Sequence, residues 1–527
     1  MSNICAASPT FAEKMLTTVS SAKCIGIQAV PVNVEVNVSS GLGIHLVGLA
    51  DAAVKESLLR TITALQSVGY RIPGKKIVIN LAPADMHKKG SGYDLPIAIG
   101  IIASSGQEEL PDLGKYVIMG ELGLDATVRD VRGALPIVEM AESSGCGCIL
   151  PVSSAMEAVE YGSGRIYGVS VLTDVIRILK GEDCQDLLVR NMARESPELR
   201  AEHLQDVGDF SDIFGQAEAK RGLEIAAAGG HNVLLVGPPG SGKSSLAKAM
   251  AGILPPMTTA EAVETSKIYS VAGKGGVCGG LVRSRPFRSP HYSSSLNAII
   301  GGGSDSIMPG EISLAHNGVL FLDEFCEAPK RVTEALRAPM EDRKVTISRL
   351  KSKVEYPSSF MLVAATNPCP CGYYGDGDRC TCTPGKRAAY FSRLSGPVMD
   401  RIDIQLWLSP VDASRLVRRR KEESSADVAK RVCAARQIQL RRFAGDGIHT
   451  NAEMNGQLME RYCRTGKSGA EFLERLISSE RLSARAYSRI LKVSRTVADL
   501  EGVEDISLEH LSEAAGYRLL DRKDIFL

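Results

Sequence analysis

The sequence predicts a multidomain α/β protein, with an N-terminal α+β domain, a central parallel-sheet domain and a helical C-terminal domain. Three observations predict this fold class. The 527 residues exceed what a single hydrophobic core normally serves, since domains usually hold about 100 to 200 residues. Short β-rich runs alternate with helix-like runs over most of the chain. After Pro410 the pattern becomes almost purely helical.

The composition is that of an ordinary globular protein, with 44% hydrophobic and 23% charged residues. No apolar run reaches the roughly 18 residues of a membrane span, and the N-terminus lacks the charged and apolar parts of a signal peptide. We therefore expect a cytoplasmic protein with no membrane partner. The 13 cysteines then indicate thiols or metal ligands rather than a disulfide framework. A net charge of +1 gives no global attraction to nucleic acid, so any such surface must be local.

The expected domain boundaries follow from periodicity and composition. Residues 1–180 alternate strand-like and helix-like runs and form the α+β domain. Residues 181–209 are charged and lack a strong apolar face, which is typical of a linker. Residues 210–408 alternate strands and helices as a parallel sheet requires. Residues 409–527 contain the helix-like stretches of the C-terminal domain.

A glycine-rich turn, Gly237-Pro-Pro-Gly-Ser-Gly-Lys243-Ser244, lies between an apolar run and a helix-like stretch. Its spacing is that of the P-loop, G-x-x-x-x-G-K-[ST], whose backbone N–H groups wrap phosphates at a helix N-terminus. Lys243 is expected to reach the β- and γ-phosphates, and Ser244 to bind Mg²⁺ through its hydroxyl oxygen. The sequence thus predicts an ATP and magnesium site rather than a structural turn. The phosphate-binding residues are Gly237, Pro238, Pro239, Gly240, Ser241, Gly242, Lys243, Ser244 and Ser245.

Two further strand-like runs end in residues suited to ATP hydrolysis. Gly318-Val-Leu-Phe-Leu-Asp323-Glu324 is typical of a Walker B strand. Asp323 is expected to hold magnesium through water, and Glu324 to polarise the attacking water as a general base. Phe360-Met-Leu-Val-Ala-Ala-Thr-Asn367 is a second buried strand, and Asn367 at its end is expected to orient that water. Taken alone, an asparagine after a strand is usually only a turn former.

Four cysteines occur close together as Cys369-Pro-Cys371 and Cys380-Thr-Cys382. Four thiolates suit tetrahedral Zn²⁺, and the intervening loop is long enough to close on itself. The spacing Cys-x-Cys is less typical than Cys-x-x-Cys, so free thiols or redox chemistry remain the alternative. The cluster directly follows Asn367, so a structural zinc ion would stiffen the wall of the ATP site.

Further segments complete a larger pattern: Arg285-Pro-Phe-Arg-Ser-Pro-His291, residues 309–324, residues 365–375, Ser395-Gly-Pro-Val-Met-Asp-Arg-Ile-Asp403 and Leu482-Ser-Ala-Arg-Ala-Tyr-Ser-Arg489. With the P-loop, they resemble the YifB/ComM-type magnesium-chelatase-like AAA+ ATPases over nearly the whole chain. The resemblance implies a ring, commonly a hexamer, in which each ATP lies between two subunits.

The resemblance also implies roles for three arginines. Arg401 occupies the position of the family's arginine finger, which stabilises the charge that develops on the γ-phosphate of a neighbouring subunit. Arg393 is a second candidate for the same role. Arg485 resembles the sensor-2 arginine of the helical lid, which would link loss of the γ-phosphate to lid movement. For each arginine, the alternative is a surface ion pair.

Two basic segments resemble pore elements of this AAA+ clade. Residues 273–288 resemble the helix-2 insert, and residues 344–355 resemble the pre-sensor-1 hairpin. In a ring both would project toward the pore and follow a DNA backbone without reading its sequence. A solvated basic hairpin is the alternative. The candidate DNA contacts are Lys274, Arg283, Lys344, Arg349, Lys351 and Lys353.

The N-terminal domain resembles the Lon-protease-like fold, through residues 119–129 and 89–96. Aligning the glycine-rich turn of the second segment puts Gly92 at the position of the nucleophile, with Ser91 one residue away. A Ser-Lys dyad needs hydrogen-bond reach, so we expect a non-proteolytic domain that binds DNA or stabilises the ring. The basic residues 85–90 are compatible with that role.

The sequence therefore favours an ATP-driven DNA motor, resembling helicases that promote branch migration in recombination and natural transformation. One alternative is a magnesium-chelatase-type metal-insertion motor, which the Lon-like domain disfavours because such motors lack it. The other is an ATP-dependent Lon-like protease. The preferred DNA structure, the polarity of movement and the physiological partners do not follow from the sequence.

Overall fold

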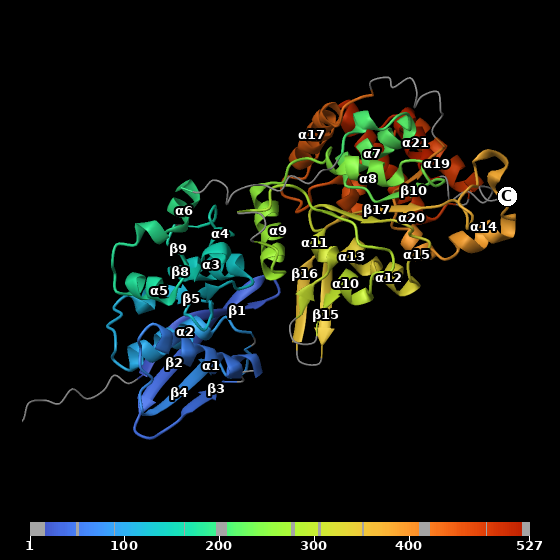
Figure 1. Ribbon diagram of the computed structural model, residues 1–527. Helices are drawn as coiled ribbons and strands as arrows, with labels where there is room; N and C mark the ends of the chain where they lie inside the picture. Colours follow the sequence, from blue (N-terminus) through green and yellow to red (C-terminus); the bar gives the residue numbers. More distant parts are fainter. Residues whose placement is uncertain are drawn as a thin grey trace, which may run out of the picture. The chain divides into compact units, whose positions relative to one another are not determined.

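The computed structural model describes residues 16–48, 52–88, 90–162, 164–195, 208–275, 280–303, 307–349, 352–410, 422–480 and 482–518 (Figure 1). The chain divides into two compact units. Unit 1 comprises the described residues of Met1–His203, Ser266–Val282 and Ser304–Met308, and unit 2 comprises those of Leu204–Thr265, Arg283–Gly303 and Pro309–Leu527. None of the helices formed by the described residues is long and apolar enough to cross a membrane.

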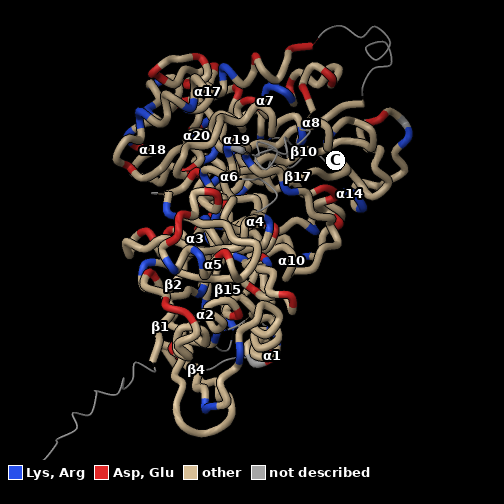
Figure 2. The backbone as a smooth tube through the Cα atoms, turned by 60° about the vertical axis from the view of Figure 1, so that its left-hand side comes forward, with Lys and Arg blue, Asp and Glu red and all other residues tan. Residues whose placement is uncertain are grey.

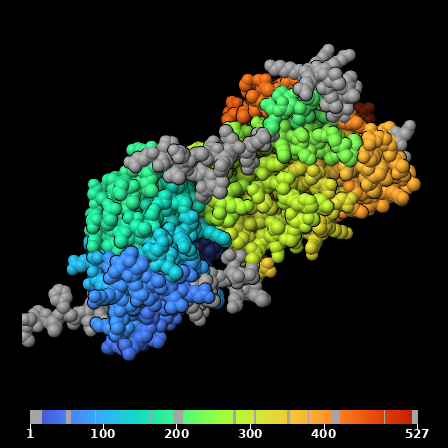
Figure 3. Space-filling view, in the orientation of Figure 1, coloured from blue at the N-terminus to red at the C-terminus, as the bar shows by residue number. Residues whose placement is uncertain are grey.

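Unit 1 contains two sheets with helices packed on them. A four-stranded sheet has the order β1-β2-β4-β3, and a three-stranded sheet has the order β5-β8-β9. The strands are β1 Leu16–Ile25, β2 Gln28–Ser39, β3 Ile44–Val47, β4 Lys76–Ala82, β5 Tyr116–Ile118, β6 Glu121–Leu122, β7 Val128–Arg129, β8 Gly147–Pro151 and β9 Ile166–Val169. The helices are α1 Ala52–Ser67, α2 Asp94–Ser104, α3 Ala134–Ser143, α4 Val152–Met156, α5 Leu172–Leu179 and α6 Val189–Glu195. In the space-filling view these residues form one continuous body (Figure 3).

Side-chain alternation explains the first sheet. Along β2, Val32, Val34, Val36 and Val38 are buried while their neighbours are more exposed, as the period of a strand requires. Helix α2 is almost wholly buried and packs on β1 and β2. The α+β character expected of the N-terminal residues is confirmed.

Unit 2 is built on a five-stranded parallel sheet with the order β11-β14-β17-β10-β18. Its three central strands are apolar and buried along their whole length, as expected of a parallel sheet covered on both faces. The strands are β10 Val233–Val236, β11 Phe287–Arg288, β14 Val319–Leu322, β17 Met361–Thr366 and β18 Ile404–Trp407. The expected parallel sheet is confirmed.

Shorter elements occur between and after the strands of this sheet in the sequence. The helices are α7 Ala217–Gly229, α8 Lys243–Ala251, α9 Thr259–Val271, α10 Leu296–Ile300, α11 Glu311–Leu314, α12 Lys330–Ala335, α13 Arg337–Asp342, α14 Pro384–Phe391 and α15 Gly396–Met399. The remaining strands are β12 Gly301–Gly302, β13 Met308–Pro309, β15 Lys344–Arg349 and β16 Ser352–Pro357. Helix α9 is assigned to both units, because residues from Ser266 onward belong to unit 1.

The C-terminal part is helical, as the sequence predicts. Its helices are α17 Ser425–Arg442, α18 Gly456–Tyr462, α19 Lys467–Glu480, α20 Ala484–Glu501 and α21 Leu508–Gly516. Polar side chains cap their N-termini, for example Ser483 before α20 and Ser507 before α21. Apolar residues of these helices, such as Val432 and Leu511, share one core with Leu223 and Val233. The boundary expected between residues 408 and 409 therefore falls inside one compact unit.

Candidate active site

The P-loop, the Walker B residues and Asn367 meet at one edge of the parallel sheet. Strands β10, β14 and β17 are mutually parallel neighbours, so the residues that follow them lie at the same carboxyl edge. The P-loop follows β10 and leads into α8, and its Gly240 and Gly242 have φ of +79° and +87°. Such angles favour glycine, which explains why these positions carry it.

The Lys243 side chain links the P-loop to Asn367 at this edge. Its ammonium donates to the carbonyls of Gly237 at 2.7 Å and Pro238 at 2.9 Å, and lies 3.3 Å from Oδ1 of Asn367. Burial lowers the pKa of Lys243, while the Asp323 and Glu324 carboxylates act in the opposite direction. The structure thus brings the expected phosphate-binding lysine and the expected sensor asparagine into contact.

Ser244 and Asp323 are also in contact, since the serine hydroxyl donates to Oδ2 of Asp323 at 3.0 Å. A hydroxyl and a carboxylate oxygen at this separation are ligands of the kind that Mg²⁺ accepts beside phosphate. Glu324 has a φ of +50°, a conformation that is uncommon for a residue with a side chain. Its backbone N–H donates to Oδ1 of Asp323 at 2.9 Å. Glu324 is exposed and therefore open to a water molecule.

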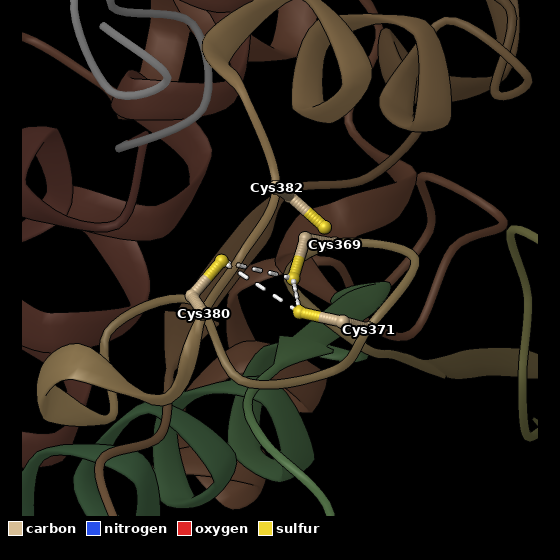
Figure 4. A group of neighbouring side chains, drawn as sticks. All are labelled: Cys369, Cys371, Cys380 and Cys382. Carbon is tan, nitrogen blue, oxygen red and sulfur yellow. Dashed lines mark hydrogen bonds between the residues drawn. The ribbon is translucent and has the colours of Figure 1, made fainter.

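The four cysteines of residues 369–382 form a cluster (Figure 4). The Sγ atoms of Cys369 and Cys371 are 3.2 Å apart, Cys380 lies 3.7 Å from each, and all four lie within 4.8 Å of one another. Tetrahedral zinc with Zn–S bonds of about 2.3 Å requires sulfurs about 3.8 Å apart. A hydrogen bond from the backbone N–H of Tyr373 lowers the pKa of Cys371 to about 6, whereas burial raises the pKa of Cys369 to about 12. Cys369, Cys371, Cys380 and Cys382 therefore fit a zinc ion.

The cysteine loop packs against the P-loop. Gly372 has a φ of +85°, and a Cβ at this position would lie 3.1 Å from Cδ of Pro239. Beyond it, the Tyr374 ring meets the Trp407 ring edge-on, with centroids 6.0 Å apart. Trp407 ends β18, so the loop packs beside the carboxyl ends of β10 and β18. The expected link between the cluster and the wall of the ATP site has this geometric basis.

Arg401 lies at the opposite edge of the sheet. Strand β18 runs parallel to β10, with Val233 opposite Ile404 and Val236 opposite Trp407. Arg401 precedes Ile404, so it lies near the amino ends of these strands, whereas the P-loop follows their carboxyl ends. A four-residue strand separates the two edges by about 13 Å. The structure does not bring Arg401 to the P-loop of its own chain.

Arg485 lies beside this edge as well. Its guanidinium pairs with Asp400 at 2.9 Å, and Arg401 hydrogen-bonds Glu341 of α13. Arg401 also donates to the carbonyl of Pro397 at 2.8 Å and is only 12% exposed. The hydrogen bond from Arg401 lowers the pKa of Glu341, and the charge of Arg485 adds to the effect. The two arginines expected in catalysis are thus grouped together, away from Lys243.

Arg393 has a different environment from Arg401. Its guanidinium pairs with Glu327 at 2.5 Å, three residues beyond Glu324. It also lies over the Tyr390 ring, 5.4 Å from the centroid. Arg393 is therefore tied to the turn that follows the Walker B strand of its own chain.

The expected basic hairpin forms, with β15 and β16 antiparallel and Lys344 opposite Pro357. Val345 and Ile347 are buried while Lys344 and Lys353 are 55% and 67% exposed. Lys344 and Lys353 both lie near Glu355, at 3.4 and 3.9 Å, which reduces the net positive charge. Lys351 lies outside the described residues.

The other candidate DNA contacts are distributed between the units. Arg349 and Arg283 are exposed in unit 2, whereas Lys274 is half-buried in unit 1. The segment expected to be a helix-2 insert is therefore itself divided, with residues before Arg283 in unit 1. Lysines and arginines are interspersed with acidic residues along the described backbone (Figure 2).

The glycine-rich turn of unit 1 contains no described serine–lysine contact. The Ser91 hydroxyl donates to Glu121, and the Lys88 ammonium donates to the carbonyl of Pro83. Lys88 is fully buried, and burial lowers its pKa. Lys89 lies outside the described residues. The described partners of Ser91 and Lys88 give neither residue the arrangement of a dyad.

Sequence reasoning missed three residues around Arg401. Asn232 donates from Nδ2 to the carbonyl of Arg401 at 3.0 Å, and its backbone N–H donates to Asp403 at 3.0 Å. Asp403 pairs with Arg489 at 2.9 Å. Asp403 and Arg489 are the last residues of the two sequence segments that contain Arg401 and Arg485, and this closeness in sequence could have identified them as site residues. For Asn232, the sequence offered only its position before a buried strand.

Three known sequence families match separate parts of the chain. Residues 209–416 match the family described as magnesium chelatase, subunit ChlI. Residues 34–154 match subunit ChlI of Mg-chelatase, and residues 422–518 match magnesium chelatase, subunit ChlI C-terminal.

Two relatives are similar over nearly their full length, and a third over about half of its length. The uncharacterized protein YifB of Salmonella typhimurium is 42% identical over 516 residues, covering 97% of this chain and 99% of the relative. Competence protein ComM of Haemophilus influenzae is 41% identical over 509 residues, covering 96% of this chain and 98% of the relative. DNA replication licensing factor Mcm6 of Anopheles gambiae is 24% identical over 479 residues, covering 85% of this chain and 53% of the relative.

Proposed function

The chain belongs to the YifB/ComM family of magnesium-chelatase-like AAA+ proteins, and we propose that it is an ATP-hydrolysing hexameric motor on DNA. Its activity in this proposal is that of a helicase that promotes branch migration during recombination and natural transformation. The observation that carries the proposal is the separation of Arg401 and Arg485 from Lys243 across the sheet. A site split in this way is completed by a second copy of the chain.

Within one chain, the carboxyl edge supplies the groups that bind ATP and prepare water. Magnesium bound there would be held by Ser244 and Asp323 and would neutralise charge on the phosphates. Lys243 would contact the phosphates, Glu324 would take the proton of the attacking water, and Asn367 would orient that water.

The neighbouring chain supplies the remaining cations. Negative charge on the γ-phosphate oxygens is stabilised in the transition state by an arginine from outside the P-loop. We assign that role to Arg401 rather than Arg393, because the Arg401 segment resembles the family's arginine-finger segment and lies at the sheet edge opposite its own P-loop, whereas Arg393 pairs with Glu327, three residues after Glu324 of the same chain. Arg485, adjacent to Asp400, would enter the same intersubunit site and respond to loss of the γ-phosphate.

The DNA substrate is supported by two relatives and by the basic hairpin. One relative is named a competence protein and another a DNA replication licensing factor. In the proposed ring, Lys344, Arg349 and Lys353 would contact phosphates of the strand, since sequence-independent binding needs only charge. Lys274, Arg283 and Lys351 are further contacts in this proposal.

The cysteine cluster is proposed to hold a structural zinc ion, because its four sulfurs lie within 4.8 Å of one another and Cys380 lies 3.7 Å from both Cys369 and Cys371, close to the separation of about 3.8 Å in tetrahedral zinc sites. Four protein ligands leave no open position for catalysis. Through Gly372 and Pro239, the ion would fix the wall of the ATP site.

The N-terminal domain is proposed to be a Lon-protease-like domain without proteolytic activity, which binds DNA or stabilises the ring. Ser91 donates a hydrogen bond to Glu121 and Lys88 donates one to the carbonyl of Pro83, so neither forms the Ser-Lys dyad that proteolysis would need, and this supports the proposal. A protease assay on casein, with Arg401→Ala as the control for ATP dependence, tests this assignment.

A metal-insertion motor is the second candidate function. The descriptions of all three matching families name the ChlI subunit of magnesium chelatase, and one of these families matches the N-terminal domain. The presence of that domain therefore no longer argues against a chelatase. The magnesium-dependent ATPase would be shared by both functions.

The deciding experiment measures ATP hydrolysis with magnesium alone and with single-stranded, duplex or four-way branched DNA. Stimulation by DNA, together with movement of a branch point in a labelled four-way junction, is expected. Glu324→Gln should bind ATP but hydrolyse it slowly, and serves as the control that the motor causes the movement. ATPase activity without DNA binding or branch movement would refute the DNA motor and leave the chelatase function for test.

A further inference from the structure

Asn232, the residue before strand β10, forms hydrogen bonds with all of its polar groups. The backbone N–H of Asn232 donates to Asp403 at 3.0 Å, and its carbonyl accepts from the N–H groups of Asp403 and Ile404 at 3.0 and 3.1 Å. Its Oδ1 accepts from the N–H of Leu362 at 2.8 Å, and its Nδ2 donates to the carbonyl of Arg401 at 3.0 Å. Asn232 thus joins the amino ends of three adjacent strands to the main chain of Arg401.

Asp403 forms a second support for the same segment. It is 1% exposed, accepts from the N–H of Asn232, and pairs with Arg489 at 2.9 Å. Nδ1 of His231 lies 3.5 Å from the Asp403 carboxylate, and Lys492 is a further charged neighbour. Burial would raise the pKa of Asp403, but Arg489 and His231 outweigh it and hold the pKa well below its usual range. The segment around Arg401 is therefore fixed at both ends.

We propose that Asn232 is a positioning residue for Arg401, which it holds in register through the hydrogen bond from its Nδ2 to the Arg401 carbonyl. The inference rests on the proposed function, in which Arg401 stabilises the transition state at the ATP of the neighbouring subunit. An arginine finger acts only when its guanidinium reaches the γ-phosphate, and a displacement of about 1 Å can cost about a hundredfold in rate. Asn232 itself touches neither ATP nor the reacting water.

Asn232→Ala removes two side-chain hydrogen bonds and leaves the backbone of the strand intact. We expect kcat for ATP hydrolysis to fall about ten- to a hundredfold, whereas the affinity for a fluorescent ATP analogue stays within about twofold. Gln439→Ala is the matched control. That buried amide also makes two main-chain hydrogen bonds, to Ala228 at 3.1 Å and from Asn451 at 3.0 Å, in the same unit. It should lose a similar amount of stability while kcat changes little.

The decisive measurement repeats Asn232→Ala in an Arg401→Ala background, with a radiolabelled phosphate-release assay that detects very slow turnover. Because Asn232 acts through Arg401, the double variant should be no slower than Arg401→Ala alone. A purely structural role would lower both rates by the same factor and would weaken ATP binding.

The outcomes separate the two claims. If Arg401→Ala retains the wild-type kcat, the finger assignment in the proposed function fails, and the positioning role fails with it. If Arg401→Ala is slow, three results would overturn only the positioning role of Asn232. These are a wild-type kcat for Asn232→Ala, weaker ATP binding by Asn232→Ala, and a double variant that is slower than Arg401→Ala.

Discussion

Glu157 provides a quantitative test of how unit 1 is held together. Its carboxyl group is buried at the end of α4 and accepts a hydrogen bond from Ser270 of α9. Burial raises the pKa of Glu157 to about 7, partly opposed by the Ser270 hydrogen bond and assisted by the charge of Asp130. The variant Glu157→Gln keeps a hydrogen-bond acceptor for Ser270 but never ionises.

The sign of the pH dependence follows from the raised pKa. The folded protein binds this proton more tightly than the unfolded chain, whose glutamate pKa is near 4.5. The stability that the protonated group contributes is fully present below pH 4.5 and is lost as the pH rises toward 7. At 1.36 kcal/mol per pKa unit, the loss is about 3 kcal/mol at most. Between pH 5.5 and 8.5, Glu157→Gln should gain about 2 kcal/mol of stability relative to the wild type.

Urea unfolding followed by pulse proteolysis measures this difference on the full chain. Trp407 is the single tryptophan of the sequence and lies in unit 2, so its fluorescence reports the other unit separately. Glu109→Gln, at an exposed carboxylate of unit 1, is the control and should follow the wild type. A constant difference between Glu157→Gln and the wild type over this pH range would refute the reasoning.

Three further predictions concern the ATP site. Gly372→Ala places a Cβ 3.1 Å from Cδ of Pro239, so it should displace the P-loop and weaken ATP binding about fivefold, which corresponds to about 1 kcal/mol. Gly377→Ala is the control, because Gly377 also has a positive φ, of +54°, but a Cβ there meets nothing within 4 Å, so ATP binding should stay unchanged. An equal effect of both variants in equilibrium ATP titrations would contradict this. Cys380→Ser should lower the zinc content, measured by elemental mass spectrometry, from about one ion per chain toward zero, and a zinc-free wild type would refute the site. Arg401→Ala should lower kcat by about a thousandfold and Arg393→Ala by much less, and the reverse order in steady-state ATPase assays would reassign the finger.

The local pattern of the sequence predicted the elements that carry its chemistry. The runs before Lys243, Asp323 and Asn367 are each apolar for the length of a buried strand, and all three form such strands. The sequence predicted a parallel sheet but no strand order, because the hydrogen bonds between β10, β14 and β17 join residues far apart in the chain. The sequence pattern changes near residue 408, but it does not reveal that the helices after this point share one hydrophobic core with the parallel sheet.

By itself, the sequence determined which residues are the candidates for binding ATP and for acting on it, because P-loop chemistry requires fixed residue types at fixed spacing. Only the tertiary structure decided which of them meet in one chain. Parallel pairing of β10 with β18 places Lys243 and Arg401 at opposite edges of one sheet, and no spacing along the chain encodes that separation. The contacts of Asn232 arise in the same way, since they join three strands that are adjacent in space but distant in sequence.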